Sequence, residues 1–319
     1  MSHLYRISVN TFRESIREPV YFLMLLASLL LIGHFPWMTI FVFFEQLKLV
    51  VDSSMATTMI FSLSVAVLCA SYTVSREMRN GTVLLLLSKP VSRWSFVLGK
   101  IIGIIMAALL FSFICCCASV ISVYIAVDQF RMEMHLYGAF IALVGLGCVV
   151  GMVMNFLNGS SFAEFATYAT AVIIAGMLCY CLKFRPHPEL SLKDLAKALF
   201  MLNIAVVIMS TLAVGAATRM DVVPTMCFCS IFFFVGLMSS HLFLRQSDSE
   251  LLNMVCNVCY AVIPNWQFFW LADAIAVGRH IPNAYVINGC IYGAIYFLVA
   301  TIWAIALFQD REAAAGARD

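Results

Sequence analysis

The sequence predicts an all-α polytopic membrane protein with about eight transmembrane helices, six at the fewest. Hydrophobic residues make up 63% of its 319 residues and charged residues only 11%, whereas a soluble domain is about half apolar and a quarter charged. The apolar residues gather in eight runs, each of roughly the 20 residues that cross a bilayer core. Of 19 basic and 17 acidic residues, only Glu164 lies inside these runs. The runs are 20–44, 53–74, 101–127, 136–157, 162–182, 198–217, 222–243 and 284–308.

Before the first run, residues 1–18 are expected to form an amphipathic helix that lies along the membrane surface. Apolar residues from Tyr5 to Ile16 share one helical face, and three arginines share the other. Arginine on the polar face of such a helix is typical of a segment among lipid headgroups. Pro19 ends this helix, so the chain divides into the interfacial helix 1–18 and a transmembrane domain over 19–319.

Basic residues predict which side of the membrane each loop faces. With eight spans, eleven Lys and Arg residues fall on the side of the N-terminus and eight on the other. Because basic loops stay in the cytoplasm, we expect a cytoplasmic N-terminus, with 244–283 on the opposite side. The basic stretch 183–197 fits this assignment poorly, since it places four positive charges outside. It predicts either a basic helix on the outer surface or one wrongly assigned span.

The stretch 251–283 is apolar, but Pro264 and Pro282 break it. The run before Pro264 has about 13 residues, which is too short to cross a bilayer. Trp266 and Trp270 follow it, and tryptophan is typical of the headgroup level. The stretch therefore predicts short re-entrant or interfacial helices before the last span.

A few polar groups within apolar surroundings have competing interpretations. Cys256 and Cys259 form a CxxC pair, but no second pair or nearby histidines complete a metal site, so a disulfide between them stays open. Glu164 follows Ser161 at the spacing of a capping box, in which each side chain bonds the other's backbone amide. The alternative for an intramembrane carboxylate is a proton relay.

Recognisable catalytic chemistry is absent from the sequence. It contains no GxxxxGK[ST] phosphate loop, so the chain is not expected to bind ATP by that route. It contains no HExxH metal motif, and its net charge of +2 does not suggest a nucleic-acid partner. Gly145, Gly147 and Gly151 are expected to let two helices approach closely. We therefore predict neither a catalytic residue nor a metal site.

One predicted cytoplasmic loop, 75–100, differs from the others. It carries five of the 19 basic residues. Gly81 is expected to end the preceding helix, because glycine accepts a left-handed conformation. Residues 82–88 form two short apolar turns, and Pro90 breaks them. The sequence thus predicts a short apolar helix held between the ends of two spans, which calls for a protein partner or the membrane surface.

Two patterns carry a family resemblance. The first is Glu77-x-x-x-Gly81-Thr82, then Ser88-Lys89-Pro90-Val-Ser-Arg93, Phe96 and Gly99-Lys100. The second is Ile263-Pro-Asn-Trp-Gln-Phe with the tail Phe308-Gln-Asp-Arg311-Glu312. With both, the chain resembles the permease subunits of ATP-binding-cassette transporters, in the type II exporter class. Members of that class usually have six spans, so the hairpin 136–182 is expected to be additional.

The resemblance implies a transport subunit that forms the translocation path and is not itself an enzyme. It implies two permease chains, identical or different, that face each other in the bilayer above two ABC ATPase subunits on separate chains. ATP and Mg²⁺ are then bound by the ATPases, and this chain holds no cofactor. The expected location is a cell membrane, crossed many times, in particular a bacterial cytoplasmic membrane.

The loop is the expected coupling element to the ATPase. A short helix fixed to the ends of two spans passes a displacement into the membrane, whereas a flexible loop absorbs it. The expected docking residues are Glu77, Arg79, Gly81, Thr82, Leu84, Leu85, Lys89, Pro90 and Arg93. The alternative is that the basic residues only follow the positive-inside rule and bind anionic lipid.

Two other function classes stay open at this point. An ATP-independent secondary transporter usually has broken mid-membrane helices and buried ionisable residues, for which Glu164 is the only candidate. A membrane-integral assembly or scaffold subunit is the other class. The sequence identifies no substrate-binding residue.

Overall fold

The structure, a computed structural model, describes residues 2–39, 46–79, 93–127, 131–186, 190–243 and 250–316. Nearly all of these residues are helical, which confirms the predicted class. From the N-terminus come α1 (Ser2–Arg17), α2 (Pro19–Met38) and α3 (Gln46–Ala70), which continues through a π-helical turn, η2 (Ser71–Ser75), into α4 (Arg76–Arg79). Next come α6 (Arg93–Ile125), the two-residue strands β1 (Ala126–Val127) and β2 (Arg131–Met132), α7 (Met134–Asn158) and α8 (Phe162–Phe184). The last part comprises α9 (Leu192–Ala217), α10 (Val222–Leu237), α11 (Ser239–Phe243), α12 (Glu250–Val262), the 3-10 helix η3 (Trp266–Phe269), α13 (Ala272–Ala276) and α14 (Asn283–Gly316).

Seven helices in the described chain are long and apolar enough to cross a membrane, and they match seven of the eight predicted runs. They are Pro19–Met38, Gln46–Ser75, Trp94–Ile125, Met134–Asn158, Phe162–Phe184, Leu192–Ala217 and Asn283–Gln309. The eighth run, 222–243, forms α10 and α11 and is interrupted at Met238. With 16 residues, α10 is about 24 Å long, a little shorter than a bilayer core.

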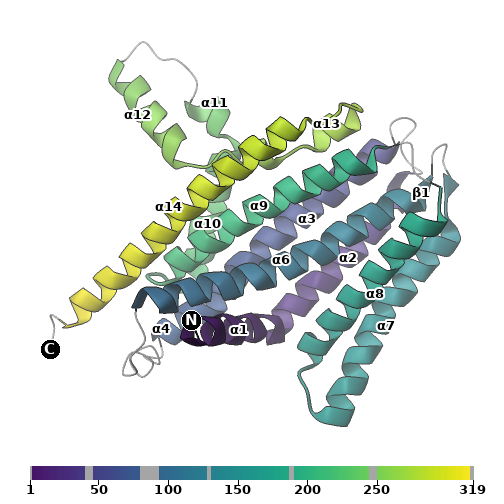
Figure 1. Cartoon of the computed structure of the whole chain (residues 1–319), viewed down its shortest axis with the longest axis horizontal. Helices are drawn as coiled ribbons and strands as arrows, with labels where there is room; N and C mark the ends of the chain where they lie inside the picture. Colours follow the sequence, from purple (N-terminus) through teal and green to yellow (C-terminus); the bar gives the residue numbers. More distant parts are fainter. Residues whose placement is uncertain are drawn as a thin grey trace.

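The position of α14 beside α9 shows that the chain between them returns across the bundle. Near the start of both helices, Lys197 Nζ donates to the carbonyl of Ile281 at 2.6 Å. Just past the end of α9, Arg219 Nε donates to the carbonyl of Leu307 at 2.8 Å. The two helices therefore run parallel, and the chain has to cross back between them. Figure 1 shows α10 behind α9 on this return path.

The bundle has two ends, which Figure 1 shows at the bottom and the top. The end with α1 and α4, here called the loop end, also holds the turn before α8 and the turn after α9. The opposite end, here called the far end, holds β1, β2, η3 and α13. The N-terminus and α13 thus lie at opposite ends of the bundle.

Burial distinguishes central spans from peripheral ones. In the most apolar 18-residue stretch of each span, 67% of the residues are buried in the span that includes α3, 67% in α6 and 72% in α9. In α7 only 22% are buried. The α7–α8 hairpin lies at one side of the bundle (Figure 1). Within it, a Cβ on Gly147 would meet Thr170, and one on Gly151 would meet Ala166. These two glycines permit the close helix approach expected of them, but nothing lies near Gly145.

Candidate functional site

The N-terminal helix α1 lies against the beginning of α6 at the loop end. A Cβ on Gly103 would lie 2.6 Å from the backbone carbonyl of Ser8, and one on Gly99 would lie 2.7 Å from the Ile7 side chain. Real Cβ atoms do not approach so closely, so glycine is required where the two helices touch. This contact gives a physical reason for Gly99 in the motif of the 75–100 loop.

The two faces of α1 follow the predicted division only in part. Arg6, Arg13 and Arg17 are exposed, as expected of a polar face. The most buried side chains are Ser8, Thr11, Ser15 and Ile16. Tyr5, expected on the apolar face, is 70% exposed. The buried stripe is therefore rich in small hydroxyl side chains, because close packing on α6 leaves little room, and the location of α1 among headgroups stays a prediction.

Lys100 lies next to Gly99 and is the central cation of the loop end. Its side chain is 4% exposed, and Nζ lies 2.7 Å from Glu77 Oε1 and 3.8 Å from Glu14 Oε2. A buried ammonium needs a close carboxylate, because the charge loses its water on burial. Lys100 on α6 therefore connects the stem of the loop, through Glu77, with α1, through Glu14.

Glu14 is the less well paired of the two carboxylates. Burial raises the pKa of its carboxyl above the ordinary value of 4.5, and the attraction of Lys100 lowers it by less. The shorter contact of Lys100 is to Glu77. In this structure, therefore, the ammonium is bound mainly to the loop stem, and α1 holds a second carboxylate beside it.

A second ion pair connects α1 with α8 and corrects the capping-box prediction. Arg17 Nε donates to Glu164 Oε2 at 2.6 Å, and the Glu164 side chain is 9% exposed. Ser161 begins the helix, but its side chain makes no capping hydrogen bond. The capping box is wrong because a cation from 147 residues away binds the carboxylate more strongly than a backbone amide does.

The stem of the loop is also anchored to the turn between α9 and α10. Ser75 Oγ donates to the carbonyl of Ala217 at 3.1 Å and to that of Met220 at 2.8 Å. Next to it, Arg76 Nη1 lies 3.9 Å from Glu18 Oε1. Hydroxyl bonds of this kind satisfy carbonyls at a helix end that have no partner within the helix. The stem is thus held by α1, α6 and the α9–α10 turn.

Of the predicted docking residues, the structure places Glu77 fully. Arg79 is the last residue of α4 and Arg93 the first of α6, and only their backbones are described. Gly81, Thr82, Leu84, Leu85, Lys89 and Pro90 lie outside the described residues. The structure therefore shows the two helices that flank the loop and the contacts of its stem.

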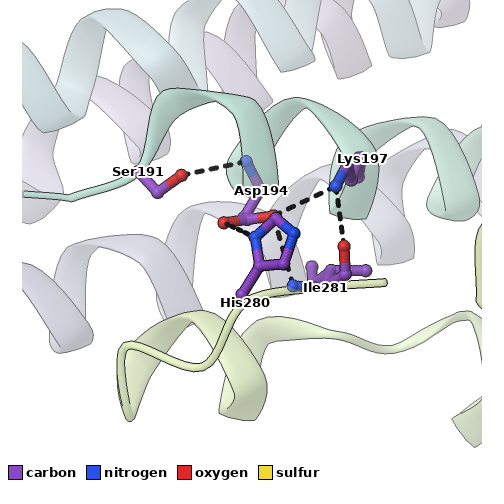
Figure 2. Close-up of polar contacts among 5 residues, drawn as sticks. All are labelled: Ser191, Asp194, Lys197, His280 and Ile281. Atoms are coloured by element: carbon purple, nitrogen blue, oxygen red, sulfur yellow. Dashed lines mark hydrogen bonds and ion pairs between the residues drawn. The ribbon is translucent and has the colours of Figure 1, made fainter. Parts of the chain in front are cut away.

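At the far end, acidic side chains offset the basic stretch that disagreed with the predicted topology. Arg185 Nη1 lies 3.3 Å from Glu133 Oε2. Lys197 Nζ lies 3.4 Å from Asp194 Oδ1 (Figure 2). Only the fold brings Arg185 and Glu133 together, since 52 residues separate them. Two of the four positive charges in 183–197 are thus paired with acidic side chains, and the side of the membrane on which this stretch lies stays a prediction.

A groove of about 530 Å³ lies between α3 and α10. Its lining is largely apolar, with methionine, leucine, isoleucine and phenylalanine side chains from the two helices and Met209 from α9. Gln267 and Trp270, from η3 and the residue after it, border it on the side of the far end. No Lys, Arg, Asp or Glu lines it. Neither the sequence pattern nor the motifs identified these residues, because helices far apart in the chain form the groove.

The CxxC pair of the sequence, Cys256 and Cys259, does not line this groove. Cys256 and Cys259 are free thiols on α12, one helical turn apart. Among the described residues, no group of three or more His, Cys, Asp or Glu side chains is arranged to hold a metal ion.

Seven long apolar helices in the described chain define the class of polytopic all-α membrane proteins. The family model of the ABC-2 family transporter protein matches residues 16–182, over half of the chain. The chain therefore belongs to this family and is a permease-type membrane transport subunit. No curated protein matches it.

The family match confirms the resemblance and leaves part of it untested. The match includes the 75–100 loop and extends through α7 and α8, so it does not mark that hairpin as an addition. It ends before the segment 260–312, where the second resemblance lies. Membership of this family implies association with an ABC ATPase and with the membrane.

Proposed function

We propose that this chain is the permease subunit of an ATP-driven exporter, and that the 75–100 loop couples it to a separate ATPase. The observation that carries this proposal is the ion pair between Glu77 and the buried Lys100, with Glu14 beside it. It connects the loop stem with two further helices. A displacement of the loop is thus passed to α1 and α6 as well as to α3.

The anchoring favours coupling over mere attachment to lipid. A ligand or partner shifts a conformational equilibrium only through contacts that differ between the two states. Binding of anionic lipid requires basic side chains near the surface, but it does not require a buried ion pair or the two Ser75 hydrogen bonds. These contacts hold the stem firmly, as a mechanical connection to the ATPase demands.

The groove between α3 and α10 is the proposed part of the substrate path on this chain. Its apolar lining suits an uncharged, largely apolar substrate, and Ser64, Ser230 and Gln267 offer a few polar contacts. Its open side would face the second permease copy. ATP and Mg²⁺ would be bound by the partner ATPase, since this chain has no phosphate loop.

The docking test uses Leu85→Asp, which places a charge in the apolar part of the loop. We expect the variant to insert into the membrane normally and to lose ATPase association or the coupling of hydrolysis to transport. Lys48→Gln and Lys183→Gln, outside the loop, are the charge-changing controls and should do neither. A Leu85→Asp variant that assembles and transports normally would overturn the coupling assignment. Glu77→Lys is less suitable, because it also places a second ammonium beside Lys100.

The ATPase itself is tested by affinity purification of the tagged chain from its native membranes. We expect a soluble subunit with a phosphate loop to co-purify, and the purified single chain to show no nucleotide turnover. Transport by the chain alone, driven by an ion gradient and without a bound ATPase, would identify a secondary transporter instead.

A further inference from the structure

The far end contains a group of polar contacts that the proposed coupling does not use. Asp194, in the first turn of α9, accepts the Ile281 N–H at 3.2 Å. Lys197 Nζ, one turn later, donates to the Ile281 carbonyl at 2.6 Å and lies 3.4 Å from Asp194 Oδ1. Two side chains of one helix thus hold both polar backbone groups of one residue (Figure 2). Asp194, Lys197 and Ile281 are called the clasp below.

The clasp is buried, so its contacts are costly to break singly. The side chains of Asp194 and Lys197 are 7% and 21% exposed, and Ile281 is 2% exposed. Losing one partner would leave a buried carboxylate, ammonium or peptide group unsatisfied. The clasp is therefore expected to be either closed or fully open, which is the property of a two-state element.

The clasp holds the segment 266–282, which borders the groove. Ile281 follows α13 by a few residues, and α13, in which Ala272 and Ile275 are buried, packs on α3. At the beginning of the same segment, Gln267 and Trp270 line the groove. About ten residues of chain therefore connect the wall of the groove to the clasp, and the beginning of the segment borders the groove on the side of the far end.

We propose that the clasp is the anchor of a gate at the far end, which keeps 266–282 over the groove when closed and exposes the groove when open. Asp194 and Lys197 are then positioning residues, since they act through the backbone of Ile281. The proposal rests on the proposed function in one respect, because the groove is the proposed substrate path. Its tests below use no ATPase and no transport, so their outcome is independent of that function.

His280 adds a further contact to the clasp. Its side chain is 74% exposed, and Nδ1 lies 3.1 Å from Asp194 Oδ2.

Hydrogen exchange at the Ile281 amide tests the clasp in the full chain in lipid nanodiscs. In Asp194→Asn and Lys197→Gln we expect exchange to be at least about tenfold faster than in the unchanged chain. The matched controls are Asp273→Asn and Lys193→Gln, which change exposed charges nearby and should leave the exchange unchanged. Equal exchange in all five chains would overturn the clasp. Lys197→Gln keeps the test valid if Asp194→Asn does not fold.

Thiol labelling tests the gate separately from the clasp. Cys229 lines the groove and is 2% exposed, and a soluble maleimide should react with it several-fold faster once Lys197→Gln is added. The Cys229→Ala chain corrects for the other native cysteines, and Lys193→Gln is again the control. Faster exchange at Ile281 with unchanged labelling of Cys229 would overturn the gate, because the clasp would then open without exposing the groove.

Discussion

At the scale of single residues, the loop end depends on how Lys100 is neutralised. Its ammonium is buried and has a near carboxylate in Glu77 and a more distant one in Glu14. Lys100 is part of the sequence motif, but the motif alone assigned it no function. Its role depends on Glu77, 23 residues earlier, and on Glu14 of a different helix, neither of which the motif pairs with it.

We expect Glu77→Gln to destabilise the chain by about 3 kcal/mol, because it leaves the ammonium without its close counter-charge. Thermal unfolding of the purified chain in detergent measures this as a lower midpoint. Glu77→Gln combined with Lys100→Met should recover most of the loss, since no buried charge then remains. A double variant as unstable as the single one would contradict the ion-pair explanation.

Glu14→Gln should behave differently from Glu77→Gln. Because burial raises the pKa of Glu14, the folded chain binds its proton more tightly than the unfolded chain does. The resulting stability is fully present below pH 4.5 and is lost as pH rises through the folded pKa. Near pH 7, Glu14→Gln should therefore be as stable as the unchanged chain, or slightly more stable.

The check is the thermal midpoint of both chains at several pH values from about 4 to 7. The unchanged chain should lose stability relative to Glu14→Gln as the pH rises. If Glu14→Gln is instead the less stable chain at neutral pH, the attraction between Glu14 and Lys100 outweighs the cost of burial.

At the scale of elements, the amphipathic helix was predictable because its charges recur at helical spacing. The helix that α1 packs against was not predictable. The contact with α6 depends on Gly99 and Gly103, and the sequence does not show that two backbones approach closely there. The eighth run also formed a shorter helix than expected, since α10 ends at Leu237 and a new short helix begins at Ser239. Hydrophobicity continues through this break, so composition alone did not reveal it.

Gly103→Ala should separate α1 from α6 and cost more than about 1 kcal/mol, because the new Cβ meets a backbone carbonyl that has no rotamer to change. Gly145→Ala is the matched control, since nothing lies within 4 Å of its added Cβ and alanine favours the helix. Thermal unfolding compares the two variants. Equal stability would contradict the close contact between α1 and α6.

At the scale of the whole molecule, the parallel run of α9 and α14 places both ends of the described chain at the loop end. We expect Asn158→Cys and Asn257→Cys, both at exposed positions, to react with an impermeant thiol reagent from opposite sides of the membrane. In intact cells only Asn257→Cys should be labelled, because the predicted cytoplasmic side holds Asn158. Labelling of both from one side would contradict the predicted topology.

The sequence by itself determined the membrane class, the positions of the spans, the location of the loop and the family. These follow from the composition of short stretches and from motifs, which act locally. Only the tertiary structure decided which charges pair, how α9 and α14 run side by side, and where the groove lies. The reason is separation along the chain: 147 residues lie between Arg17 and Glu164, and 87 between Asp194 and Ile281. A charge in an apolar environment binds the partner that the packed helices bring to it, and the local sequence does not contain that information.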